Sequence, residues 1–368
     1  MRIAFFADSY KPFLSGVTNS IEILVKELRK LGHQVYIFAP KYPGHVDTDK
    51  DIVRFPSIGT HYPKFRLAIP YVNRIPKVDL IHAQTPFQVG LMARYLARRE
   101  GVPLVYSFHT LFTKYVHYAK FIPEPLSKMS LVTYIRSFCR GANAIITPSE
   151  LSARVLRSWG VKKDIKIIPS GVEIEAVKRK ELSRKLRKSY SVPIDAKVLI
   201  YVGRISKEKN LPFLIRAYKK IYKKNSNVYL VMVGGGPYVE KIQKERLPNL
   251  ILTGEVPYPE VLAHYAMGDV FVFSSLTETQ GLVVAEAKAM GLPVVAIFAG
   301  ALVGTVLSGI DGYLVSRSQQ SFVEHVNRLL ADDNLRKKMG FQAYGDARDR
   351  FSSDKVAKQV ERVYNSLL

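Results

Sequence analysis

The chain has 368 residues, 47% of them hydrophobic, and one cysteine, Cys139. This length predicts two domains of roughly 180 residues each, and the lone cysteine excludes an internal disulfide and argues against a cysteine-rich metal site. The 55 basic and 31 acidic residues give a net charge of +24, which predicts a polyanionic partner: nucleic acid, an anionic membrane surface or phosphate-bearing substrates.

The N-terminal half alternates buried strands with helices. Residues 3–7 form an apolar run that Asp8 ends, which is too short for a signal-peptide core and favours a first strand. A turn containing Gly16 follows, and then a helix over residues 17–31. Further strands are predicted at residues 34–39, 79–82, 104–108, 144–147 and 165–169, and further helices at 86–99, 125–140 and 149–159. This alternation is typical of a doubly wound α/β domain.

The same pattern restarts at Lys197, after a basic stretch over residues 162–190. Strands are predicted at residues 198–202, 229–233, 250–253, 270–273 and 294–297, and helices at 211–224, between later strands, and from 318 to the end. The chain therefore predicts two doubly wound, Rossmann-like domains facing across a cleft.

Two stretches carry alternative interpretations. Residues 289–310 contain no charge and are long enough to span a bilayer, but their glycines and Pro293 favour buried core. The basic helix over residues 178–188 is interpreted as a solvated surface, with contact to phosphates or lipid headgroups as the alternative.

The stretch over residues 275–293 carries the strongest functional pattern. Glu278 and Glu286 are separated by seven residues, and Gly281 between them is placed where a strand ends and a helix begins. Amide groups at a helix start attract phosphates, and carboxylates accept hydrogen bonds from sugar hydroxyls. An ordinary acidic helix face is the alternative.

Loops after other predicted strands contribute further candidates. In the loop over residues 203–210, Arg204 and Lys209 suit a diphosphate that gains charge as it leaves, unless they are merely exposed cations. Gly16 allows close backbone approach to an anion, unless the turn alone requires glycine. His109 follows a buried strand and would lie at the cleft edge, although a lone histidine is more often structural.

The segment over residues 111–122 mixes aromatic and basic side chains, as a membrane-interface segment does. These side chains include Phe112, Lys114, Tyr115, Tyr118 and Lys120. A partly buried helix or loop is the alternative. Asp47 and Asp49 form a DxD pair, but no buried strand precedes them, so we interpret them as an exposed turn rather than a metal site.

Taken together, these motifs resemble the large retaining glycosyltransferase family of the GT-B fold that carries an ExxxxxxxE motif, and within it the diacylglycerol glucosyltransferases. The resemblance covers nearly the whole chain. It is carried by FADSYKPFLSGVTNSI (6–21), IHAQTPFQVGL (81–91), FHTLFTKYVHY (108–118), PSGV (169–172), VGRISKEKN (202–210), VGGGP (233–237) and TETQGLVVAEAKAMGLPVV (277–295).

The resemblance implies an N-terminal acceptor-binding domain (1–170), a C-terminal nucleotide-sugar-binding domain (171–350) and a last helix (351–368) that packs back towards the N-terminal domain. It implies a UDP-sugar donor, with UDP-glucose expected, and no metal or cofactor. Glu278 would bind the sugar, Glu286 the ribose, and Arg204 and Lys209 the diphosphate. The other implied contacts are Gly16 at the diphosphate, His109 at the sugar, Gly281 and Leu282 at the donor, and Gly254, Glu255 and Val256 at the base.

The implied reaction is hexose transfer with retention, by a front-face route in which a leaving phosphate oxygen takes the acceptor proton; Glu278 as a covalent nucleophile is the competing idea. The implied acceptor is a membrane lipid such as diacylglycerol. The enzyme would then be cytoplasmic and peripheral on the inner face of an anionic membrane. Open alternatives are a soluble acceptor, a sugar-nucleotide epimerase of the same fold and, more distantly, a nucleic-acid binder, for which the chain carries no recognised module.

The chain departs from the family pattern in two places. Residues 301–306 read ALVGTV where family members commonly carry a Pro-Glu pair, and Thr113 and Lys114 stand where lipid glucosyltransferases often have acidic residues. Both departures bear on donor contacts and acceptor identity, and the oligomeric state is not predicted.

Overall fold

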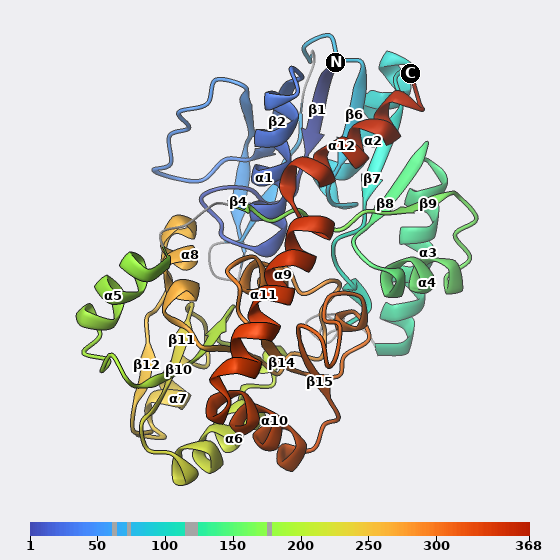
Figure 1. The fold of residues 1–368 in the computed structure, drawn as a ribbon. Helices are drawn as coiled ribbons and strands as arrows, with labels where there is room; N and C mark the ends of the chain where they lie inside the picture. Colours follow the sequence, from blue (N-terminus) through green and yellow to red (C-terminus); the bar gives the residue numbers. More distant parts are fainter. Residues whose placement is uncertain (61–64, 72–74, 115–123, 175–178) are drawn as a thin grey trace. The chain divides into compact units, whose positions relative to one another are not determined.

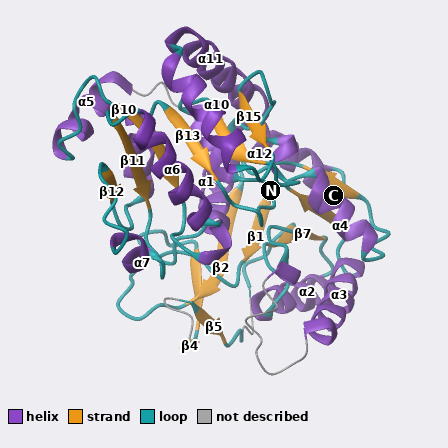
Figure 2. Cartoon of the chain, turned by 90° about the horizontal axis from the view of Figure 1, so that it is seen from below, coloured by secondary structure: helices purple, strands orange, loops and turns teal. Residues whose placement is uncertain are grey.

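A computed structural model describes residues 1–60, 65–71, 75–114, 124–174 and 179–368 (Figure 1). The chain divides into two compact units, which we call unit 1 (Met1–Gly171 with Ser353–Leu368) and unit 2 (Val172–Ser352). Each unit contains a parallel sheet with helices packed on it (Figure 2). The expected class of two doubly wound α/β domains is confirmed.

The sheet of unit 1 has seven strands in the order β3-β2-β1-β6-β7-β8-β9, all paired in parallel. Its strands are β1 (Arg2–Phe6), β2 (Gln34–Pro40), β3 (Ile52–Phe55), β6 (Leu80–Ala83), β7 (Leu104–Ser107), β8 (Ala144–Thr147) and β9 (Ile165–Ile167). An antiparallel pair, β4 (Ser57–Gly59) and β5 (Arg66–Ala68), forms a separate two-stranded sheet. The helices are α1 (Gly16–Lys30), α2 (Gln88–Glu100), η1 (Phe112–Lys114), α3 (Glu124–Arg140), α4 (Glu150–Ser158) and α12 (Ser353–Asn365).

Alternate residues of β1 supply the two cores of unit 1, because successive side chains of a strand point to opposite faces. Ala4 and Phe6 pack with the apolar side chains of α2, α3 and α4. Ile3 and Phe5 pack with α1 and α12 on the other face. The last helix, α12, thus completes one of these cores through Val356, Val360, Val363 and Tyr364.

The sheet of unit 2 has six parallel strands in the order β12-β11-β10-β13-β14-β15. They are β10 (Lys197–Val202), β11 (Val228–Val233), β12 (Leu250–Leu252), β13 (Val270–Phe273), β14 (Val294–Ile297) and β15 (Gly312–Val315). The helices are α5 (Arg179–Ser189), η3 (Lys207–Lys209), α6 (Leu211–Lys224), α7 (Val239–Gln243), α8 (Tyr258–Met267), α9 (Leu282–Ala289), η4 (Leu302–Gly304), α10 (Gln319–Ala331) and α11 (Asp333–Arg350).

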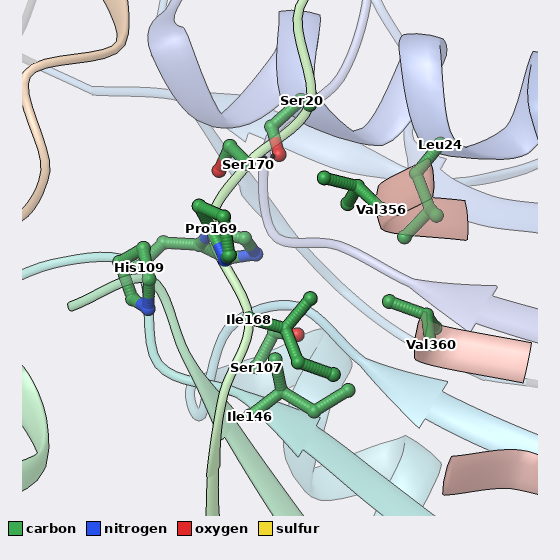
Figure 3. Close-up of a pocket in the computed structure, with 12 residues that line it drawn as sticks. Ser20, Leu24, Ser107, His109, Ile146, Ile168, Pro169, Ser170, Val356 and Val360 are labelled. Atoms are coloured by element: carbon green, nitrogen blue, oxygen red, sulfur yellow. Dashed lines mark hydrogen bonds between the residues drawn. The ribbon is translucent and has the colours of Figure 1, made fainter. Parts of the chain in front are cut away.

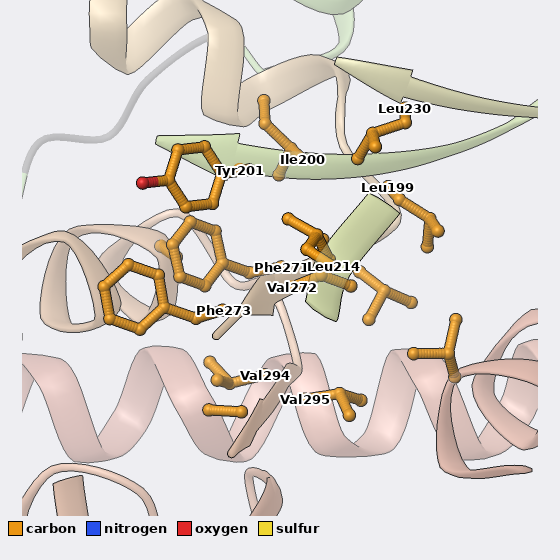
Figure 4. Packing of buried hydrophobic residues seen from close by; sticks show 14 of the residues in the cluster. Leu199, Ile200, Tyr201, Leu214, Leu230, Phe271, Val272, Phe273, Val294 and Val295 are labelled. Atoms are coloured by element: carbon orange, nitrogen blue, oxygen red, sulfur yellow. The ribbon is translucent and has the colours of Figure 1, made fainter. Parts of the chain in front are cut away.

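The core of unit 2 forms around β10, β13 and β14 (Figure 4). The ring of Phe273 lies 5.9 Å from that of Tyr201 and 5.8 Å from that of Phe271. In the uncharged stretch 289–310, the part around β14 is buried core as interpreted, whereas Phe298, Val303 and Ile310 are exposed. Among the described residues, no helix is long and apolar enough to cross a membrane.

The basic helix α5 is only partly a solvated surface. Leu182 and Leu186 pack against the core of unit 2, while Arg184 and Lys185 are exposed. Arg187, which the sequence groups with these cations, instead points inward and donates to the Met267 carbonyl and to Asp269. The reason is that the helix periodicity places residue 187 at the edge of the apolar face.

Candidate active site

The order of the strands locates a ligand site in unit 2. The chain lays β11 and β12 on one side of β10 and then β13 and β14 on the other, so the order reverses between β10 and β13. In parallel α/β sheets, ligands bind beyond the carboxyl ends of the strands at such a reversal. The loops that leave β10 and β13 carry Lys209 and Glu278, respectively.

Lys209 and Glu278 join these two loops directly. The Lys209 Nζ donates to Glu278 Oε1 at 2.6 Å, and the two side chains are only 19% and 15% exposed. Ser274 Oγ also donates to the Lys209 carbonyl at 2.8 Å. Burial opposes ionisation of Glu278, but the charge and hydrogen bond of Lys209 outweigh it and lower the pKa of the carboxyl. The sequence-predicted cation and carboxylate therefore form one charged pair.

A glycine-rich loop after β11 supports the loop that carries Arg204. A Cβ on Gly234 would lie 2.3 Å from the Gly203 carbonyl oxygen, and one on Gly236 would lie 2.4 Å from that of Ile205. The Tyr201 hydroxyl donates to the Arg204 carbonyl at 3.1 Å. Only glycine permits this approach, so the glycines of the VGGGP stretch fix the backbone at Arg204.

The residues expected to contact the base lie beside the same loop. The Gly234 amide donates to the Gly254 carbonyl at 3.0 Å. Gly254 has a left-handed φ of 73°, which favours glycine there. A Cβ on Gly235 would lie 2.7 Å from the Cγ of Glu255. The stretch from Gly254 to Val256 thus belongs to the same row of loops as Arg204.

Gly281 is the N-cap of α9, which begins at Leu282, so the helix start predicted near Gly281 is confirmed. Its φ is +82°, and a Cβ there would lie 2.5 Å from Leu302 Cδ2. Leu282 packs on a small cluster around Ala285 and Phe351. The glycine is therefore required by the turn that aims the first amides of α9.

Glu286 lies in the second turn of α9 and is 3% exposed. The Tyr265 hydroxyl donates to Glu286 Oε2 at 2.8 Å. Burial raises the pKa of this carboxyl to about 7, although hydrogen bonds from Tyr265 and Tyr258 act in the opposite direction. Tyr265 was not among the residues predicted from the sequence. The one signal for it is the spacing of seven residues that puts Tyr258 and Tyr265 on one face of α8.

A buried ion network behind the site was also missed. Lys288 is fully buried, and its Nζ contacts Asp311 Oδ2 at 2.7 Å, the Thr305 carbonyl at 2.6 Å, and Asp346. The Thr305 hydroxyl in turn donates to the Gln280 carbonyl at 2.7 Å. The network therefore holds the turn that precedes α9.

In unit 1, Gly16 is the first residue of α1, behind the N-cap Ser15. It has no left-handed φ, and nothing lies within 4 Å of where its Cβ would be. The turn therefore does not require glycine, and the alternative interpretation of Gly16 as a turn residue loses its support. The open space beside it leaves room for a ligand.

His109 follows β7 and lines a cavity of about 30 Å³ in unit 1, together with Ser20, Ser107 and Ser170 (Figure 3). Its Nε2 lies 2.8 Å from Gln84 Oε1. Burial lowers the pKa of His109 to about 4, so the ring is neutral at physiological pH. The neighbouring His82, bonded to Tyr364 Oη at 2.6 Å and Ser107 Oγ at 2.8 Å, is a fully buried structural histidine.

The other sequence candidates lie elsewhere. The centroid of the Phe112 ring lies 4.9 Å from that of Phe87 and 6.3 Å from that of Phe108. For Phe112, this packing agrees with the alternative interpretation of its segment as a partly buried helix or loop. Tyr115, Tyr118, Lys120 and the Lys114 side chain lie outside the described residues. In the DxD pair, Asp47 bonds to Arg54 at 2.6 Å and Asp49 to Arg29 at 2.6 Å, so this turn is tied down by ion pairs.

Comparison with known proteins agrees with this geometry. Residues 183–346 match the family described as glycosyl transferases group 1, and residues 14–176 match glycosyltransferase family 4. An alpha-monoglucosyldiacylglycerol synthase of Streptococcus pneumoniae is 35% identical over 323 residues, which cover 80% of this chain and 71% of the relative. This chain belongs to the group 1 glycosyltransferases.

The names of other relatives of this glycosyltransferase point to different sugars. An alpha-monoglucosyldiacylglycerol synthase of Acholeplasma laidlawii is 28% identical and covers 100% of the chain and 98% of the relative. A GDP-mannose-dependent alpha-mannosyltransferase of Corynebacterium glutamicum is 27% identical, covering 86% and 76%. The solved structure of Anabaena HepE with UDP and glucose superposes with a TM-score of 0.78 at 20% identity, over 100% of both chains. The GT-B fold of this glycosyltransferase is confirmed.

Proposed function

We propose that this glycosyltransferase moves glucose from UDP-glucose to diacylglycerol with retention of the anomeric configuration. The observation that carries the proposal is the Lys209–Glu278 pair at the strand-order reversal of unit 2, where a cation and a carboxylate stand side by side. A nucleotide sugar needs both, because its diphosphate requires positive charge and its hexose requires hydrogen-bond acceptors. The relatives that are alpha-monoglucosyldiacylglycerol synthases support glucose and diacylglycerol.

In this proposal the donor lies along the loops of unit 2. Arg204 and Lys209 hold the diphosphate, with the first amides of α9, from Gly281 and Leu282 onward, adding a positive helix end. Glu278 accepts from sugar hydroxyls, Glu286 from the ribose hydroxyls, and the stretch from Gly254 to Val256 faces the base. Gly16 gives its backbone to the diphosphate, and His109 contributes a neutral ring to the sugar.

The proposed chemistry places no metal at the diphosphate. In this proposal, Arg204 and Lys209 stabilise the negative charge that develops on the leaving group. A leaving phosphate oxygen takes the acceptor proton on the same face of the sugar, so transfer proceeds with retention and no protein base is used. Trapping of a glycosyl adduct on Glu278, detected by mass spectrometry with a slow donor, would contradict this route.

A lipid acceptor requires the enzyme to meet a membrane. The net charge of +24 suits an anionic surface, and each basic residue near such a surface contributes about 1 kcal/mol. We propose a peripheral enzyme at the inner face of the cytoplasmic membrane. Its binding to vesicles should therefore rise with their anionic lipid content and fall with added salt.

The deciding experiment offers radiolabelled UDP-glucose, UDP-galactose and GDP-mannose to the purified chain, each with diacylglycerol vesicles or with a soluble sugar acceptor. We expect label in a glycolipid with UDP-glucose and vesicles only, and proton NMR should show an α-linked product. Transfer from GDP-mannose alone would favour the mannosyltransferase relatives. A new nucleotide sugar formed without any acceptor would indicate an epimerase.

A further inference from the structure

Helix α8 presents a tyrosine to the carboxylate of Glu286. Tyr265 is fully buried, and its hydroxyl lies 2.8 Å from Glu286 Oε2 and 3.1 Å from the Val283 carbonyl oxygen. Val283 belongs to the first turn of α9 and Glu286 to the next. The hydroxyl proton is therefore shared between the start of α9 and the carboxylate that this helix carries.

This contact removes a freedom that the glutamate would otherwise have. The last torsion of a glutamate side chain is broad, so an unrestrained carboxylate samples many orientations. Beside the hydrogen bond from Tyr258, the one from Tyr265 to Oε2 fixes the plane of the carboxylate, and the second acceptor of Tyr265, the Val283 carbonyl, ties that plane to the start of α9. A carboxylate aimed in this way can meet two adjacent hydroxyl groups without first losing rotational entropy.

We propose that Tyr265 is the positioning residue of the ribose site: by orienting Glu286, it sets how strongly the enzyme prefers ribonucleotides to nucleotides that lack ribose hydroxyls. This inference rests on the proposed function, which assigns Glu286 to the ribose. Tyr265 touches the donor nowhere in this scheme, since its hydroxyl is used entirely within the protein.

Calorimetric titration of the full chain with UDP and with 2′,3′-dideoxy-UDP tests the proposal. The titrations are run at pH 8, above the pKa of about 7 of Glu286, so that its carboxyl group is ionised. We expect the wild type to bind UDP roughly tenfold or more tightly than the dideoxy nucleotide, because hydrogen bonds to a charged group are the stronger kind. In Tyr265→Phe the preference should fall to roughly threefold or less, through weaker binding of UDP. Binding of the dideoxy nucleotide should stay unchanged.

Tyr218→Phe is the matched control. Tyr218 is a buried tyrosine of the same unit whose hydroxyl lies 2.9 Å from the Pro248 carbonyl oxygen and 3.1 Å from that of Val228. Its loss should lower thermal stability and leave the UDP preference intact. Circular dichroism establishes that both variants are folded.

Each remaining outcome has a distinct meaning. If Tyr265→Phe keeps the full preference, or weakens both nucleotides equally, Tyr265 is structural and the inference is wrong. If the wild type binds UDP without any preference over the dideoxy nucleotide, the ribose role of Glu286 and the inference fall together, while the UDP donor stands. If the wild type binds no UDP, the proposed function fails as well.

Discussion

Lys209 and Glu278, 69 residues apart in the chain, share a hydrogen bond of 2.6 Å that spans the strand-order reversal of unit 2. Each side chain compensates the charge of the other in a largely buried place. A bound diphosphate would draw on the same Lys209 ammonium, which has three donors and can serve both partners. The pair is thus a charged site that is stable on its own and suited to an anionic, hydroxyl-rich ligand.

Breaking this pair from one side should destabilise unit 2. Lys209→Met leaves a mostly buried carboxylate without its partner, and we expect a loss of about 3 kcal/mol in the free energy of unfolding. The double variant Lys209→Met with Glu278→Gln should recover most of that loss, because no lone charge remains. Urea unfolding of the two single variants and the double variant measures the coupling. Strict additivity of the single effects would contradict an interacting pair.

The two glutamates should differ in kinetics. Glu286→Ala should raise the KM for UDP-glucose roughly tenfold or more with a small change in kcat, because the ribose does not change during the reaction. Glu278→Ala should lower kcat as well, since the proposed function places Glu278 at the reacting sugar. Steady-state rates at varied donor concentration separate these effects. Near-normal kinetics in both variants would undo the assignment.

The glycines Gly16 and Gly281 should respond in opposite ways to alanine. Gly16→Ala should fold with unchanged or slightly higher stability, because its Cβ meets nothing and alanine favours a helix. Its donor KM should nevertheless rise, since the methyl group occupies the proposed ligand space.

Gly281→Ala should lose roughly 1–3 kcal/mol of stability, because its φ is +82° and Leu302 is in the way. Thermal unfolding measures the stability of both variants, and steady-state rates at varied donor concentration give their KM. An unchanged KM in Gly16→Ala would show that Gly16 does not contact the donor.

Glu286 should give unit 2 a pH dependence of known sign. Its pKa is raised from 4.5 to about 7, so the folded state holds a proton that the unfolded state releases between these values. The stabilisation is therefore complete below pH 4.5 and is lost as the pH rises to about 7, by up to roughly 3 kcal/mol. Glu286→Gln should unfold with a flatter dependence over this window. Denaturant titrations at pH 5 and pH 8 give the free energy of unfolding of both proteins. An equal change of this free energy between the two pH values in both proteins would contradict the assignment.

Sequence periodicity predicted the elements of the two sheets where apolar runs are long and both faces are buried, as in β1 and β13. It missed β3, β4, β5 and β15, because strands of only three or four residues carry little periodic pattern. The start of α9 was predictable because the turn needs glycine at residue 281. A turn can thus be predicted from the sequence where its backbone conformation allows only one residue type.

Partnerships across the chain were not predictable in the same way. Lys209 and Glu278 were each proposed separately, but nothing in the spacing says that they bond to one another. Tyr265 and Lys288 read as ordinary helix residues, since their partners come from elements that only the folded sheet brings near. Phe112 shows the reverse case, in which an apparent surface aromatic packs on neighbouring rings.

The assignment of α12 to unit 1 makes unit 2 an insertion within unit 1. Helix α12 covers the face of β1 that carries Ile3 and Phe5. On the ribosome, the whole of unit 2 is synthesised before α12. Unit 2 can therefore complete its core first, although unit 1 begins the chain. A fragment ending at Gly171 would lack Tyr364, the buried partner of His82, and would expose an apolar face during expression. Separating the units for study requires a circular permutant that joins α12 to the start of unit 1, rather than a simple truncation.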